Sequence, residues 1–225
     1  MNKYSVYVLT YKNEQRKENM IERFNKLGIE VTVTEGYNIE DLSSIVEDWS
    51  DHKYRTWSQM ESHLVNIKQF YETGDEYGIF CEDDIFISKD FKQRINNIIT
   101  DCSNLNLDIV LLGHLLYTHP KESWCCKQYV ENYYSYDNDL WGAHCYLLTR
   151  KYARVLLDYY SIKWAIENPS SPYCSDWTIT KLSTKRVLVF PPLAVEEGIV
   201  VTDHQGQVDF HRNCTQYQLT TGEFI

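Results

Sequence analysis

The sequence predicts a single α/β domain in which helices flank one central, mainly parallel sheet. Short apolar runs suited to strands alternate with amphipathic segments of helical period, and this alternation is typical of parallel sheets. Residues 107–113 are apolar almost throughout, as expected of a strand buried on both faces. The chain has 225 residues, and separate cores arise only beyond roughly 250 residues. We therefore expect one domain over residues 1–225.

The chain opens with a β-α-β unit. Residues 4–10 are rich in Val and Tyr and predict a strand. A helix follows, because apolar residues recur at helical spacing: Met20, Ile21, Phe24 and Leu27. Gly28 ends this helix as a C-terminal glycine does, and residues 29–34 alternate in polarity as a second strand should.

The middle of the chain continues the alternation of helix and strand. Apolar residues on one helical face predict a helix from Trp57 toward Gly74: Met60, Leu64, Ile67 and Tyr71. The next expected elements are a strand at 77–81, the acidic run Glu82-Asp83-Asp84, an apolar stretch at 85–87, a helix at 89–100 and the buried strand at 107–113. The acidic run therefore lies at the end of a strand.

The last part of the chain begins with a segment that lacks any regular period. Residues 114–140 mix Tyr, Trp, Cys and charges, and so predict a mobile binding loop or lid. The expected elements after it are a strand at 143–149, a helix that presents Tyr152, Val155, Leu156 and Tyr159, a helix at 176–182 and a strand at 187–190. Pro191-Pro192 ends that strand and completes the fold.

Composition and charge exclude several classes of protein. The 22 Lys and Arg against 32 Asp and Glu give a net charge of −10, which argues against a nucleic-acid-binding protein. An acidic protein still binds an anionic phosphate ligand if a divalent cation reverses the local charge. We see no signal peptide and no apolar stretch of the roughly 20 residues that a transmembrane helix needs. With seven cysteines, an odd number, we expect reduced thiols and a cytoplasmic protein of bacterial or viral source.

The acidic run Glu82-Asp83-Asp84 is the main candidate for chemistry. Ligands of open α/β sheets gather beyond the carboxyl ends of the strands, where this run is expected. Three adjacent carboxylates repel one another unless a cation compensates them, and oxygen ligands favour Mn²⁺ or Mg²⁺ over zinc. The structural alternative is that Asp83 or Asp84 caps a helix or begins a turn.

An ordered set of motifs resembles glycosyltransferase family 25, which includes lipopolysaccharide-biosynthesis enzymes and procollagen galactosyltransferases. The resemblance spans most of the chain. It rests on residues 9–13 and 16–20, Glu61-Ser62-His63-Leu64, residues 80–85, 107–113 and 142–150, Ser175-Asp176-Trp177, and Pro191-Pro192-Leu193. Each motif is loose by itself, whereas the ordered set is more specific.

The resemblance implies a Rossmann-like GT-A fold and a nucleotide-sugar donor, expected to be a UDP-sugar. It implies transfer of a hexose with inversion and a metal on the DXD-like acidic run. Asp84 is then the best single metal ligand, and Glu82 or Asp83 lies closer to the ribose. Where the family carries Asn and then Leu-Asp after the first strand, this chain has Leu9-Thr10-Tyr11, which leaves the nucleotide base open.

Further donor contacts are expected after the first strand and on the helix before the acidic run. Thr10 and Tyr11 belong to the donor-binding turn, and Lys12 and Arg16 are candidates for the diphosphate if the following helix points its N-terminus at the pocket. Solvated surface charge is the alternative for both cations. His63 is expected to hold a donor phosphate or a metal-bound carboxylate, with a satisfied core histidine as the alternative.

The general base and the last metal ligand are expected late in the chain. Asp176 stands before a short helix beside Trp177, where partial burial raises a carboxyl pKa, and we expect it to be the base. A helix N-cap is the competing interpretation of Asp176. Late histidines complete the metal shell in many GT-A enzymes, and of His204 and His211 we favour His204, which follows Asp203.

Two other functions compete with sugar transfer. A metal-dependent phosphoesterase or nuclease also uses carboxylates, but the chain has few separated acid and histidine motifs for one. A catalytically silent sugar- or nucleotide-binding relative has the same fold without turnover. The sequence leaves open which sugar is moved, whether the acceptor is a glycan, a lipid-linked sugar or a protein side chain, and the oligomeric state.

Overall fold

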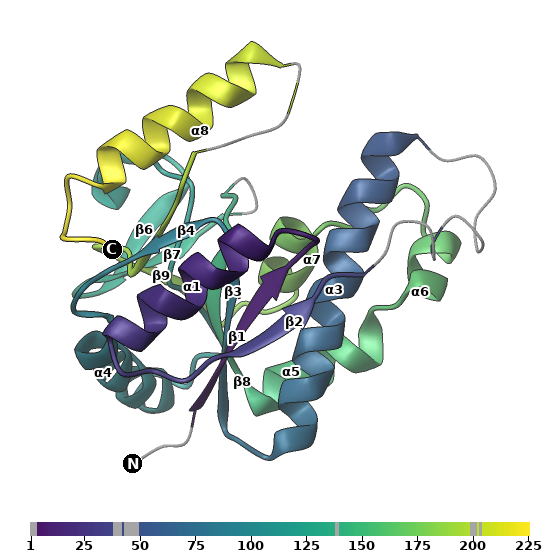
Figure 1. Cartoon of the computed structure of the whole chain (residues 1–225), viewed down its shortest axis with the longest axis horizontal. Coiled ribbons are helices and arrows are strands. Elements are labelled where there is room, and N and C mark those ends of the chain that lie inside the picture. The colour runs from purple at the N-terminus through teal and green to yellow at the C-terminus, as the bar shows by residue number, and fades with distance from the viewer. Residues whose placement is uncertain (1–3, 38–41, 43–49, 138–139, 199–201, 203) are drawn as a thin grey trace.

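The computed structural model describes the chain except for residues 1–3, 38–41, 43–49, 138–139, 199–201 and 203. Its described strands form an eight-stranded sheet and a separate two-stranded sheet (Figure 1). The order across the large sheet is β2 (Thr32–Glu35), β1 (Tyr4–Thr10), β3 (Tyr77–Glu82), β8 (Cys145–Thr149), β5 (Ile109–Leu111), β9 (Arg186–Val189), β7 (Tyr133–Tyr136) and β6 (Cys126–Val130). The small sheet pairs β4 (Ile85–Ile87) with β10 (Ala194–Glu196).

The α/β class is confirmed, but the sheet is mixed rather than mainly parallel. Strand β1 runs parallel to β2 and β3, and β5 runs parallel to β9. Strand β8 lies antiparallel between β3 and β5, and the hairpin β6–β7 adds an antiparallel edge beside β9. A strand buried on both faces is apolar whichever way it runs, so the apolar run at 143–149 does not reveal its direction.

Helices cover both faces of the large sheet (Figure 1). Helices α1 (Glu14–Lys26) and α4 (Phe91–Asn104) pack on one face, and α3 (Asp51–Thr73), α5 (Arg150–Tyr159), α6 (Ile162–Glu167) and α7 (Ser175–Lys181) pack on the other. Alternation along β1 divides its side chains between the faces: Val6 and Val8 join the core under α1, and Tyr7 joins the core under α3. Helix α8 (Gln205–Gln218) lies apart from these layers.

The strand at 4–10 matches its prediction at both ends, whereas residues 114–140 do not form the structureless loop expected of them. They contain a short helical turn at Pro120–Glu122 and the hairpin β6–β7, which lengthens the sheet. Asn132 turns that hairpin with a positive φ of 64°, a conformation that Asn tolerates better than most residues. The sequence prediction also omitted α6, β10 and α8. None of the described helices combines the length and apolar character needed to cross a bilayer.

Candidate active site

The acidic run lies where two parallel strands end together. Glu82 is the last residue of β3 and is the register partner of Leu9 near the end of β1. Asp83 and Asp84 form the turn between β3 and β4. The helix that follows, α4, begins after Asp90, so the helix-cap alternative for these two aspartates is wrong. The carboxylates lie at the carboxyl edge of β1 and β3, where ligands of α/β sheets bind.

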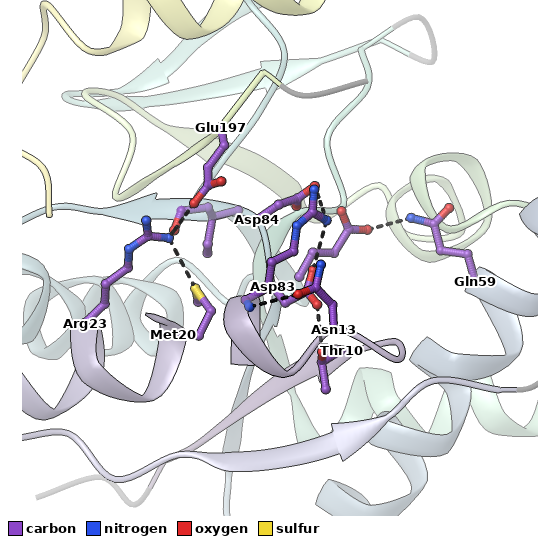
Figure 2. A network of polar contacts seen from close by, with 11 residues as sticks. Thr10, Asn13, Met20, Arg23, Gln59, Asp83, Asp84 and Glu197 are labelled. Atoms are coloured by element: carbon purple, nitrogen blue, oxygen red, sulfur yellow. Dashed lines mark hydrogen bonds and ion pairs between the residues drawn. The ribbon is translucent and has the colours of Figure 1, made fainter. Parts of the chain in front are cut away.

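Asp83 is held by residues from the first β-α connection (Figure 2). Thr10 Oγ1 donates a 2.7 Å hydrogen bond to Asp83 Oδ2. Asn13 caps α1 by accepting a hydrogen bond from the Arg16 backbone N–H, which places Arg16 in the first turn. Arg16 Nη1 then lies 3.4 Å from Asp83 Oδ1 and 3.3 Å from Asp84 Oδ2. Arg16 thus contacts the acidic run directly and is not merely solvated surface charge.

Glu82 is fixed from the other side by α3. Gln59 Nε2 donates to Glu82 Oε1 at 2.7 Å, and His63 Nε2 lies 3.4 Å from the same oxygen. His63 is 1% exposed, and its Nδ1 lies 2.8 Å from the Tyr146 hydroxyl. Burial opposes ionisation of Glu82, yet the contacts with His63 and Gln59 hold its pKa below the ordinary value. His63 is therefore a satisfied core histidine that also anchors a site carboxylate.

Asp84 carries the most perturbed carboxyl group of this cluster. Burial raises its pKa to about 7, and the negative charges of Glu82, Asp83 and Glu196 add to the effect, while Arg16 opposes it. The strand pairing of β10 with β4 brings Glu196 into the cluster. A hydrogen bond of 2.7 Å from the Glu197 N–H to the Asp84 carbonyl oxygen fixes the same turn.

A second ion pair connects α1 to this turn. Arg23 Nη1 lies 2.8 Å from Glu197 Oε1 and donates a 2.7 Å hydrogen bond to the Ile85 carbonyl oxygen. Both side chains are largely buried. Figure 2 shows Arg23 and Glu197 on one side of the aspartates of the acidic run. The first and last parts of the described chain are therefore joined at the acidic run.

A cavity of about 280 Å³ opens beside the acidic run, and we call it the arginine-lined cavity. Its lining includes two arginines, Arg16 and Arg55, and two tyrosines, Tyr11 and Tyr37. The remaining lining residues are Leu9, Thr10, Gly36, Ser58, Gln59, Ser62, Glu82, Asp83 and Asp84. Of the predicted donor residues, Lys12 and His63 are not part of this lining, and the backbone N–H of Lys12 donates to Glu35.

A larger cavity of about 630 Å³ adjoins it, and we call it the acidic cavity. Gln59 and Glu82 line both cavities. The remaining lining residues are Thr56, Leu115, Trp141, Gly142, Ala143, His144, Cys174, Asp176, Glu196, Gln207, Phe210 and His211. The two cavities therefore meet at the last residue of β3.

Asp176 lines the acidic cavity and is held by backbone donors. Its Oδ1 accepts hydrogen bonds from the Gly142 N–H at 2.9 Å and the Ala143 N–H at 2.7 Å. The N-cap of α7 is Cys174, so the N-cap alternative for Asp176 is wrong. Burial raises the pKa of Asp176, and the charge of Glu82 raises it further. No described residue donates a hydrogen bond to its other oxygen, which leaves Oδ2 available to a ligand.

The two late histidines occupy different places. His204 is exposed at the start of α8 and is not part of the acidic cavity lining. His211 lies on α8 within that lining, and its Nδ1 is 2.7 Å from Glu196 Oε1. The hydrogen bond to Glu196 raises the pKa of His211, which also lies in the field of Asp176 and Asp84. The geometry therefore favours His211 over His204 as the site histidine.

The residues around Asp84 have the chemistry that a hard divalent cation requires. Carboxylate oxygens are its preferred donors, and the raised pKa of Asp84 reflects its burial first and the neighbouring negative charges second. Among the described side chains, no three His, Cys, Asp or Glu converge into a ready-made metal site. Mg²⁺-type ions are often held by one or two carboxylates together with substrate phosphates and water, which fits this partial set.

Several residues of the site were not identified as site residues from the sequence: Ser58, Gln59, Trp141, His144 and Glu196. The contact between His211 and Glu196 was not predicted either. Gln59 could have been found, because it precedes His63 by one helical turn on the same face of α3. Glu196 could not, because only the pairing of β10 with β4 brings it near Asp84.

Comparison with known sequences was made against family models and curated proteins. The model described as glycosyltransferase family 25 (LPS biosynthesis protein) matches residues 3–169. This span holds every residue of the arginine-lined cavity and ends before Asp176, Glu196 and His211. A search of the curated proteins found no match.

Two solved structures show the same fold. One is a UDP-glucose pyrophosphorylase complexed with UDP-glucose, with 10% identity over 94% of this chain and 98% of that chain and a TM-score of 0.53. The other is a glycosyltransferase involved in the glycosylation of the major capsid of PBCV-1, with 11% identity, 92% and 98% coverage and a TM-score of 0.50. At such identities the likeness concerns the GT-A-like fold alone.

Proposed function

The chain belongs to glycosyltransferase family 25, and from this we propose that it moves a hexose from a UDP-sugar to a hydroxyl group of a glycan or protein. One observation carries the proposal: two cavities meet at Glu82, and of their described linings only that of the arginine-lined cavity contains arginines. The arginine-lined cavity suits an anionic nucleoside diphosphate, and the acidic cavity suits a second substrate. A transferase needs both sites within reach of one sugar carbon.

The arginine-lined cavity is the proposed donor site. Arg16 and Arg55 offer positive charge to a diphosphate, and Tyr11 and Tyr37 offer flat faces to a nucleotide base. Glu82 or Asp83 is placed to accept hydrogen bonds from ribose hydroxyls. Asp84, with His211 in place of His204, is the proposed anchor for Mn²⁺ or Mg²⁺, and such an ion neutralises the charge that develops on a diphosphate leaving group.

Asp176 is the proposed general base. In a single displacement, the acceptor oxygen bonds to the anomeric carbon while the bond from that carbon to the diphosphate oxygen breaks. Asp176 takes the proton of the acceptor hydroxyl through Oδ2, and Gly142 and Ala143 keep Oδ1 in place. Asp176 lines the acidic cavity and the arginines line the other, which supports a proposed attack from the side opposite the leaving group and hence inversion at the sugar carbon.

Nucleotide binding and donor turnover test the proposal together. Thermal unfolding would be followed with UDP, GDP, CDP and dTDP, each with and without Mn²⁺, and release of nucleotide from the matching sugar donors would be read by mass spectrometry. We expect UDP to stabilise the protein in a Mn²⁺-dependent way and UDP to be released from a UDP-hexose. Binding without release would identify a catalytically silent relative, and absence of nucleotide binding would overturn the proposal.

The Asp84→Asn variant gives the sharpest single comparison. It removes the proposed anchor charge, and we expect donor turnover to fall by about 100-fold or more, because metal stabilisation of the leaving group is worth several kcal/mol. Asp209→Asn makes the same change at an exposed position of α8 and should leave turnover unchanged. Equal turnover in the wild type and the Asp84→Asn variant would exclude Asp84 from the reaction.

A further inference from the structure

The acidic cavity has an aromatic wall. Trp141 lines it with 45% of its surface exposed, and its carbonyl oxygen accepts a 2.8 Å hydrogen bond from the Leu115 N–H. Phe210 faces the same cavity from α8 and is braced edge-on by Tyr117, with ring centroids 6.1 Å apart. A saccharide ring has an apolar C–H face that packs on such side chains, while its hydroxyls need polar partners.

The polar groups of the cavity offer those partners. Thr56, Gln59 and Gln207 carry hydroxyl and amide groups in the lining. His144 also lines the cavity, is only 4% exposed, and its Nε2 has no hydrogen-bond partner within the described part of the chain. A buried, unpaired ring nitrogen is costly and is expected to find a partner when the site is filled.

The carboxylates of the acidic cavity limit the charge of the second substrate that can bind there. The described lining of the acidic cavity has the carboxylates of Glu82, Asp176 and Glu196, and contains neither Lys nor Arg. Two histidines, His144 and His211, also belong to the lining, and His211 is already paired with Glu196. An anionic sugar would meet unscreened like charge in this partly enclosed site.

We infer that the acidic cavity takes an uncharged saccharide as the acceptor, and that Trp141 is the platform on which its ring stacks. The inference rests on the proposed function and adds the chemical class of the acceptor. Three of the residues that define this class, Glu196, Phe210 and His211, lie beyond the segment matched by the family model.

Binding of matched glycosides tests this inference without requiring turnover. The probes are the methyl glycosides of glucose, galactose and mannose, each paired with its uronate, which differs only by a carboxylate at C6. Saturation-transfer difference NMR would be recorded with UDP and Mn²⁺ present. We expect at least one neutral glycoside to bind. Its uronate should bind at least about tenfold more weakly, because like charges repel in a partly buried site.

Two tryptophan variants separate stacking from general damage. Trp141→Ala should weaken binding of the neutral glycoside about tenfold, while Trp141→Phe keeps most of it, because a smaller ring still stacks. Trp124→Ala removes a tryptophan that is 77% exposed and outside the cavity lining, and should change nothing. UDP release from the donor in the absence of acceptor should persist in the Trp124→Ala variant.

The outcomes distinguish this inference from the proposed function. If a uronate binds as tightly as its neutral partner, if no neutral glycoside binds, or if Trp141→Ala leaves binding unchanged, the acceptor assignment is wrong. If the wild type neither binds UDP nor releases it from a donor, the proposed function itself fails.

Discussion

Arg16 has two opposing roles in the proposed function: it competes with a metal for the acidic run, and it contacts the donor. Its guanidinium contacts both Asp83 and Asp84 at 3.3–3.4 Å, the same carboxylates that a cation would need. It is also the best-placed cation for a donor diphosphate. In the proposed function, Arg16 therefore competes with a metal before the donor binds and contacts the donor diphosphate afterwards.

Replacing Arg16 by Gln should change two affinities in opposite directions. Affinity for Mn²⁺ alone should rise, since Asp83 and Asp84 lose a competing charge, whereas affinity for UDP should fall about tenfold, as expected for loss of a charged hydrogen bond. Isothermal titration calorimetry measures both. Lys17→Gln removes the same charge from α1 outside both cavities and is the control. A fall in both affinities would contradict the competition.

The Asp176→Asn variant should separate catalysis from stability. An amide oxygen still accepts the N–H groups of Gly142 and Ala143, so the fold is kept, while loss of the base should lower kcat about 10²–10⁴-fold. The pKa of Asp176 is raised in the folded protein, so its protonated form stabilises the fold. This stabilisation is complete below pH 3.8, the pKa of the unfolded aspartate, and is lost as pH rises through the pKa of the folded protein.

As pH rises above 3.8, the wild type loses this stabilisation and the Asp176→Asn variant does not. The Tm of the variant should therefore rise relative to the Tm of the wild type. Tm measured across pH values, together with single-turnover rates, checks both effects. A variant that loses stability at every pH would show that the carboxylate is needed for folding rather than for the reaction.

At the scale of elements, the buried side chain of Gln218 joins the end of α8 to the segment that follows β5. Gln218 is 1% exposed, and its Nε2 donates to the carbonyl oxygens of His114 at 2.5 Å and Leu116 at 2.9 Å. The same helix carries Phe210 and His211 into the acidic cavity. The attachment of α8 therefore fixes one wall of the proposed acceptor site.

Gln218→Met should destabilise the protein by about 1–3 kcal/mol, because two buried carbonyls lose their donor. It should also raise KM for the acceptor more than KM for the donor, since α8 lines the acidic cavity and reaches the donor only through the proposed metal contact of His211. Urea unfolding and steady-state kinetics measure these changes. Gln216→Met makes the same replacement on the exposed face of α8, and an equal effect there would contradict the argument.

Prediction from sequence succeeded where elements depend on local pattern and failed where they depend on distant pairing. The strand at 4–10 and the helix that ends just before Gly28 follow from apolar spacing and a C-terminal glycine. Helix α8 was missed because its buried positions are Cys214, Thr215 and Gln218, which do not form an apolar stripe. In the site, Asp84 was identified from its neighbours in sequence, but Glu196 was not, because its contribution requires β10 to pair with β4.

For the whole molecule, buried His114 makes stability depend on pH. Burial lowers its pKa to about 3, and repulsion from His144 adds to the shift. The unfolded chain has an ordinary histidine pKa near 6.5, so it binds a proton that the folded chain excludes between these values. The stability associated with His114 is thus full above pH 6.5 and is lost progressively as pH falls toward 3.

Acid unfolding should show this loss as a slope of about 1.4 kcal/mol per pH unit from His114 alone. His114→Leu removes the titrating group. Between pH 6 and 4, the slope of the unfolding free energy against pH should then decrease by the amount that corresponds to one proton. Urea unfolding at a series of pH values gives both slopes. Identical slopes in the two proteins would show that His114 does not titrate on unfolding.

The two cavities draw on different lengths of the chain. All residues of the arginine-lined cavity lie between Leu9 and Asp84, whereas the acidic cavity extends to His211 on α8. During translation, a ribosome has therefore produced every residue of the arginine-lined cavity long before it adds Asp176, Glu196 and Phe210. If the two cavities hold donor and acceptor as proposed, a nascent chain cannot bring the two substrates together until α8 has been made.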